Sequence, residues 1–136
     1  MDYALSTTVA AGFDETLAAT RASLADVGFG VLTEIDLAAT LKAKLDVDIP
    51  AQVVLGACRP PLAHAALEAE PSIGLLLPCN VVVRRGPHDT STTVQAIDPA
   101  TMSDLGDSPA LEQVAADAGA RLRDTLARVS GGTTTD

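Results

Sequence analysis

The sequence predicts an α+β domain, a two-layer sandwich in which helices pack on one mixed sheet. Three observations support this prediction: strand-like segments alternate with amphipathic helical segments, two strand-like segments follow one another directly, and a long amphipathic helix comes last. The expected element order is β-α-β-α-β-α-β-β-α. A chain of 136 residues suffices for one domain, predicted over residues 1–130, and residues 131–136 are predicted to be a disordered tail.

The first half of the chain begins with a strand over residues 3–9, where apolar and polar side chains partly alternate. Gly12 opens a helix that Gly28 ends, since glycine readily adopts the conformation that follows a helix. Residues 29–35 predict a second strand. Its side chains expected on one face are Phe29, Val31 and Thr33. Asp36 is the expected N-cap of a short helix with leucines at every fourth residue.

The middle of the chain holds a buried strand and a third helix. Residues 53–56 form a short apolar run and predict the third strand. The helix begins at Pro60 and Pro61, because a first helical turn tolerates residues without an N–H group. Pro71 ends it, since proline disfavours a helical conformation in the residue before it.

The last third contains a hairpin and the longest helix. Residues 75–85 and 90–97 predict the two strands of the hairpin, with Pro78 bending or delaying the first of them. Ser108 is the expected cap of the final helix and Pro109 its first residue. The expected core face of that helix is Leu111, Val114, Ala115, Ala118, Leu122, Leu126 and Val129.

Composition and charge exclude several partners. The chain has a net charge of −9 and only nine Lys and Arg residues, and its largest local basic group is Arg84–Arg85. Nucleic-acid binding needs clustered Lys and Arg to displace counterions from phosphates. Neither nucleic acid nor an anionic membrane is therefore an expected partner.

A cytoplasmic location is expected from the hydropathy pattern and the thiols. No segment approaches the roughly 20 consecutive apolar residues of a spanning helix, and the first residues carry an acidic side chain where a signal peptide has basic ones. Two cysteines without an export signal predict reduced thiols in the cytosol.

Both cysteines lie where a strand-like segment meets a connection. Cys58 lies one or two residues before the Pro60–Pro61 helix start, where unpaired N–H groups and the helix dipole favour a thiolate. The alternative for Cys58 is a small buried residue at a tight turn. Cys79, taken alone, is expected to be a structural residue of a buried strand. The spacing of the two matches no zinc template, so no metal site is assigned.

Two further side chains complete the candidate set. His64 follows Cys58 by six residues, so the two can meet across the first turns of the helix. The alternative is a half-exposed surface histidine. Glu34, at the end of the second strand, is either a general base or hard-metal ligand, or a solvated carboxylate. Capping is the expected role of Asp36.

Sequence motifs exclude the commonest enzyme classes. The chain has no Gly-rich phosphate loop of the GxGxxG or GxxxxGK[ST] type. It also lacks a GxSxG nucleophile elbow and an HExxH helix. Nucleotide hydrolysis, serine esterase and zinc protease activities are therefore not expected.

Three segments, in order along the chain, carry a resemblance to a known family. They are TEIDL from Thr33, LGACRPPLAHAAL from Leu55 and GLLLPCNVVV from Gly74. With these motifs the chain resembles the domain of unknown function 302 family from about Tyr3 to Val129. The residues that match the family motifs are Glu34, Asp36, Gly56, Cys58, Pro60, His64, Pro78 and Cys79.

The resemblance implies a compact α+β domain that self-associates, and it implies little about activity. The family commonly has Asn where this chain has Arg59, so the departure adds a positive charge beside Cys58.

Three functional hypotheses remain open at this point. The leading one is a cytoplasmic, non-enzymatic homodimer that binds a small ligand or soft metal near Cys58, His64 and Cys79, with Glu34 as a further candidate ligand-binding residue. The second is a thiol-dependent enzyme or redox protein in which Cys58 reacts, assisted by His64 or Cys79. The third is a purely structural or interaction domain. The sequence identifies no cofactor.

Overall fold

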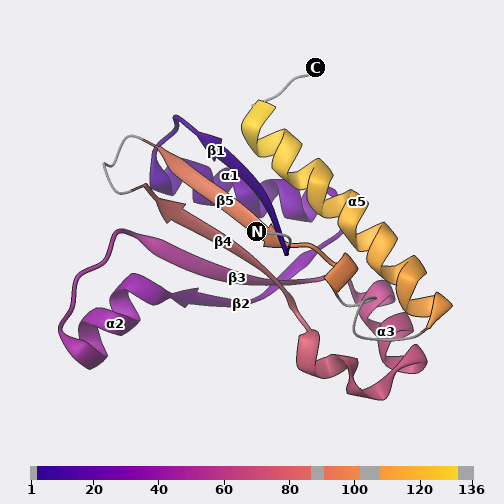
Figure 1. Ribbon diagram of the computed structural model, residues 1–136. Helices are drawn as coiled ribbons and strands as arrows, with labels where there is room; N and C mark the ends of the chain where they lie inside the picture. Colours follow the sequence, from indigo (N-terminus) through magenta and orange to yellow (C-terminus); the bar gives the residue numbers. More distant parts are fainter. Residues whose placement is uncertain (1–2, 87–90, 102–107, 132–136) are drawn as a thin grey trace.

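The computed structural model describes residues 3–86, 91–101 and 108–131. Its centre is a five-stranded sheet in the order β1-β5-β4-β3-β2 (Figure 1). The strands are β1 (Ala4–Val9), β2 (Gly30–Asp36), β3 (Gln52–Cys58), β4 (Cys79–Arg85) and β5 (Thr92–Ile97). The predicted α+β sandwich and the predicted element order are thus confirmed.

Every strand pairing among the described residues is antiparallel, whereas a mixed sheet was expected. The strands from β2 to β5 form a meander in chain order, and β1 pairs with β5 at the far edge. A helix between two strands is typical of a crossover to a parallel partner. The helix between β2 and β3, α2 (Leu37–Leu45), instead lies within a turn that returns the chain beside β2.

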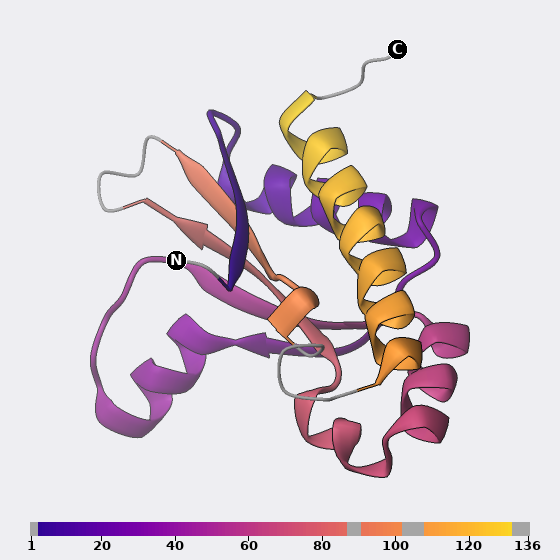
Figure 2. The same cartoon turned by 45° about the vertical axis from the view of Figure 1, so that its right-hand side comes forward.

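The helices α1 (Phe13–Asp26) and α5 (Pro109–Gly131) cover one face of the sheet (Figure 2). The helix α1 joins β1 to β2, which are the two edges of the sheet. Its 14 residues span roughly 21 Å at the usual helical rise, and four strand spacings span about 19 Å. One helix therefore crosses the whole sheet, and α5 packs beside it. The helix α3 (Pro60–Ala69) packs against α5.

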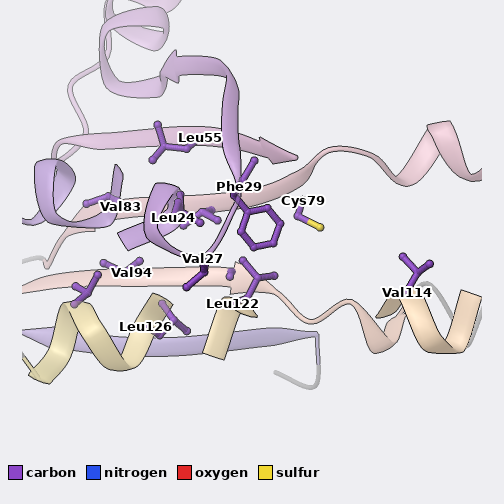
Figure 3. Packing of buried hydrophobic residues seen from close by; sticks show 14 of the residues in the cluster. Leu24, Val27, Phe29, Leu55, Cys79, Val83, Val94, Val114, Leu122 and Leu126 are labelled. Carbon is purple, nitrogen blue, oxygen red and sulfur yellow. The ribbon is translucent and has the colours of Figure 1, made fainter. Parts of the chain in front are cut away.

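The hydrophobic core lies between this sheet face and the two helices (Figure 3). On β4, Val81 and Val83 point to the helices and are fully buried, and Val94 of β5 lies beside them. Leu24 of α1 and Leu122 of α5 pack onto this surface and are also fully buried. All seven residues of the predicted α5 core face are buried, so that prediction is confirmed.

Two local predictions need correction. Thr33 does not share a face with Val31, because a bulge between them shifts the register of β2 against β3. An inserted residue at a bulge moves the following side chains to the other face, so Glu34 lies on the helix side and Thr33 on the other. The strand predicted from residue 75 begins only at Cys79, after a 3-10 helix, η1 (Pro71–Leu76).

The second face of the sheet is the feature that matters for function, because α1 and α5 leave it uncovered (Figure 2). Strand alternation places polar and small side chains there, including Ser6, Asn80, Arg84 and Gln95. We call this surface the open face. The predicted tail from residue 132 onward lies outside the described residues.

Candidate functional site

The two cysteines are neighbours in space. Ala57 of β3 is the register partner of Cys79 on β4, so Cys58 lies one residue beyond that pair. Both cysteines are free, and both line one small apolar crevice beside Phe29 and Leu62. The crevice has a volume of about 20 Å³, which is room for about one water molecule. Figure 3 shows Cys79 beside Phe29 in the core cluster.

The helix start beside Cys58 does not offer what a thiolate needs. Pro60 and Pro61 occupy the first two helical positions and have no N–H group. The next two amides, of Leu62 and Ala63, both donate to the carbonyl oxygen of Arg59 at 3.0 Å. The expectation that this terminus favours a Cys58 thiolate is therefore wrong, and burial instead raises the Cys58 pKa above its usual value.

The other predicted site residues lie apart from this crevice. His64 is on the solvent side of α3, with a 76 % exposed side chain 3.9 Å from Glu68. Glu34 forms an ion pair with Arg21 of α1, at the edge of the covered face. Asp36 accepts a hydrogen bond from the Ala39 N–H at 2.9 Å, which confirms its capping role.

No group of three His, Cys, Asp or Glu side chains among the described residues is arranged to hold a metal ion. The pair of Cys58 and Cys79 supplies two thiols, and His64 does not line their crevice. A soft-metal site would need at least one more ligand from outside the described residues or from a partner.

A much larger concave surface than the crevice lies on the open face. It is a groove of about 690 Å³ whose floor is formed by β4 and β5 and whose walls come from η1, the Leu77–Pro78 segment and the start of β1. The residues that line it are Tyr3, Ala4, Leu75, Leu76, Leu77, Pro78, Asn80, Val82, Arg84, Gln95, Ala96, Ile97, Pro99 and Thr101.

A close approach at Gly56 places one wall of this groove. A Cβ atom at Gly56 would lie 2.9 Å from Cγ of Pro78 and would also collide with Thr33. Only glycine lets Pro78 lie directly on the sheet at this point. Gly56 and Pro78, which both match the family motifs, therefore have a steric role. Their close contact holds the η1 wall beside the open face.

A hydrogen-bonded row of polar side chains crosses the groove floor. Arg84 donates from Nε and Nη2 to Oε1 of Gln95, at 3.4 and 3.2 Å. Gln95 in turn donates from Nε2 to Oγ of Ser6 at 3.0 Å. Sequence reasoning missed this row. Its only signal was alternation, since the neighbours of each of these residues along its strand lie on the helix side of the sheet.

Both the sequence and the fold are similar to those of known proteins. A family model described as a domain of unknown function, DUF302, matches residues 5–129, nearly the whole chain. The chain belongs to the DUF302 family. A crystal structure of an uncharacterized conserved DUF302 protein from Bacillus stearothermophilus is similar, with a TM-score of 0.86 and 29 % sequence identity. The match covers 95 % of this chain and 99 % of that one. No curated protein matched the sequence.

Four of the residues that match the DUF302 motifs lie at the two concave surfaces. Cys58 and Cys79 line the small crevice at the β3–α3 junction, and Pro78, packed against Gly56, lines the open-face groove. Among the described helices, none is both long and apolar enough to cross a membrane.

The pKa of Cys79 predicts a specific loss of stability at alkaline pH. Burial, and secondarily the neighbouring Cys58, raise the pKa of Cys79 to about 11. An unfolded cysteine ionises near pH 8.5, so above that pH the unfolded state loses a proton that the folded state keeps. The free energy of unfolding then falls by up to about 1.4 kcal/mol per pH unit up to the folded pKa. Urea unfolding of the protein and of Cys79→Val over this range measures the difference.

Cys79→Val has no thiol to ionise at this position, so its free energy of unfolding is expected to fall less steeply with pH above about pH 8.5. Cys58→Ser is the matched control and is expected to keep most of it, because the larger shift belongs to Cys79. Equal slopes in the wild type and Cys79→Val would contradict the buried, protonated thiol.

Proposed function

We propose that this DUF302 domain is a non-enzymatic binding protein that holds a small molecule in the groove of its open face. The single observation that carries the proposal is the groove itself, about 690 Å³ in volume and within the range of roughly 300–1,000 Å³ that is usual for small-molecule sites. It combines an apolar wall with a few polar groups on the floor, the composition that such sites share.

The crevice beside Cys58 and Cys79 supports a ligand less well. Its volume of about 20 Å³ excludes anything larger than about one water molecule. The thiol-enzyme alternative is also less supported, because a reactive cysteine has a lowered pKa and that of Cys58 is raised. The predicted site around these cysteines is therefore replaced in this proposal by the groove.

We further propose that the domain is cytoplasmic and binds neither nucleic acid nor anionic membranes. Free thiols such as Cys58 and Cys79 persist in a reducing compartment. The net charge of −9 disfavours polyanionic partners.

A side chain that fills the groove is expected to abolish ligand binding. Ala4 lies on β1 at the groove wall, and Ala4→Trp places a large ring in the cavity without touching the core. The neutral fluorescent probe phenylnaphthylamine reports binding through its increase in emission. We expect the variant to bind this probe at least about tenfold more weakly, since it loses the buried apolar contact.

Thr8→Trp is the matched control, because Thr8 is on the same strand and the same face but outside the groove lining. It is expected to bind the probe as the wild type does. Equal probe binding by Ala4→Trp and Thr8→Trp, or no binding by the wild type, would reject the groove as the site.

We also propose that the domain forms a homodimer through the segment from Gly30 to Val47, which comprises β2, α2 and the two residues after α2. Four of the eight exposed large hydrophobic side chains among the described residues lie there: Leu32, Ile35, Leu45 and Val47. No residue of α2 is buried, and a helix of nine residues is marginal in water without packing. A covering partner would stabilise it.

A second copy is the occupant that the charges favour. Both lysines of the chain, Lys42 and Lys44, lie on α2, and the rest of the molecule is strongly acidic. Lys42 is already engaged by Asp46 and Asp48, whereas Lys44 pairs with no carboxylate among the described residues. An acidic second copy would complement Lys44 across a twofold interface.

Charged substitutions in this segment are expected to give monomers. Ile35→Glu combined with Leu45→Glu introduces carboxylates into the proposed interface, where burial without a partner is costly. Sedimentation velocity is expected to show twice the mass of one chain for the wild type and one chain for the variant.

The matched control is Leu67→Glu, because Leu67 lies on α3 outside this segment and is 42 % exposed, close to the 48 % of Ile35. It is expected to remain dimeric. A monomeric wild type, or a control that dissociates as readily as the double variant, would refute this interface.

A further inference from the structure

The charge of the groove is opposite to that of the molecule. The chain has 18 acidic residues and a net charge of −9, yet none of the described residues that line the groove is Asp or Glu. Among the described lining residues, Arg84 is the one cationic side chain. The acidic residue next to the lining, Asp98, is already engaged: it accepts from the Ala100 N–H at 3.0 Å and lies 3.7 Å from Arg123.

Arg84 is held in place by neighbouring strands. The edge of its guanidinium that carries Nε and Nη2 is bonded to Oε1 of Gln95, and Gln95 is fixed in turn by Ser6. The orientation of the side chain is therefore set by β5 and β1 before any ligand arrives. Such prior ordering lowers the entropy lost on binding.

The remaining edge of the same guanidinium is available. A guanidinium carries five N–H donors, and Gln95 uses the side that includes Nε. Among the described residues no carboxylate forms an ion pair with Arg84, although seven ion pairs there involve other Lys and Arg side chains. The edge between Nη1 and Nη2 matches the two oxygens of a carboxylate.

The rest of the groove is suited to an apolar tail. Leu75 is 88 % exposed and Leu76 is 39 % exposed, and both lie on the η1 wall above a floor that includes Val82 and Ile97. Leaving such leucines in water is unfavourable, at about 25 cal/mol per Å² of apolar surface. A ligand that covers them would remove that cost.

We propose that the ligand class is an amphipathic carboxylate, with its head group paired to the free edge of Arg84 and its hydrocarbon part against the η1 wall. This inference rests on the proposed function and adds the charge and shape of the ligand to it.

The experiment compares two ligands with the same tail and different heads. Decanoate and decanol each displace phenylnaphthylamine from the wild type, from Arg84→Gln and from Arg128→Gln. Arg128 is an exposed residue of α5 away from the groove, so its substitution changes the net charge equally. We expect decanoate to bind the wild type and Arg128→Gln about tenfold or more tightly than Arg84→Gln, as charge-assisted hydrogen bonds predict.

Decanol is expected to bind all three proteins equally, because its hydroxyl gains little from Arg84. Equal affinities of wild type and Arg84→Gln for decanoate would overturn the carboxylate inference, even with the groove still binding phenylnaphthylamine. A wild type that prefers decanol to decanoate would overturn it without any variant. Failure of phenylnaphthylamine itself to bind the wild type would instead reject the proposed function on which the inference rests.

Discussion

The packing of α1 and α5 on a single face of the sheet is the constraint on which the rest of the molecule depends. The meander from β2 to β5 places Val81, Val83 and Val94 on that face, and the two helices bury them. With few aromatic residues in the chain, close packing of aliphatic side chains has to supply most of the core energy. The other face carries polar side chains such as Arg84 and Gln95 beside apolar ones such as Val82, and a ligand can be held there without disturbing the core.

This division also explains why the cysteines and the groove play different parts. Cys79 points to the covered face and is buried with the core, so its thiol is kept protonated. Pro78, one residue earlier, lies against Gly56 and shapes the groove wall. The segment around Pro78 and Cys79 thus contributes to both faces of the sheet. Cys79 has a structural role in the core, and the apolar residues before it form a wall of the candidate site.

Local patterns in the sequence predicted most of the helices and strands but did not predict the candidate site. The α5 core face and the Asp36 cap follow from spacing and side-chain chemistry, so they could be predicted. The bulge in β2 has no local signature, and it moved Glu34 to the helix side beside Arg21. The groove could not be foreseen because its parts, Arg84, Gln95 and the η1 wall, meet only through strand order, which the sequence does not encode locally.

The most direct test of the central claim, that the open face binds the ligand, is an amide NMR titration of the intact protein with decanoate. The account predicts chemical-shift changes confined to η1, β4, β5 and the start of β1, including the Arg84 Nε–H signal. Changes centred on Cys58 and Cys79, or no changes anywhere, would contradict it.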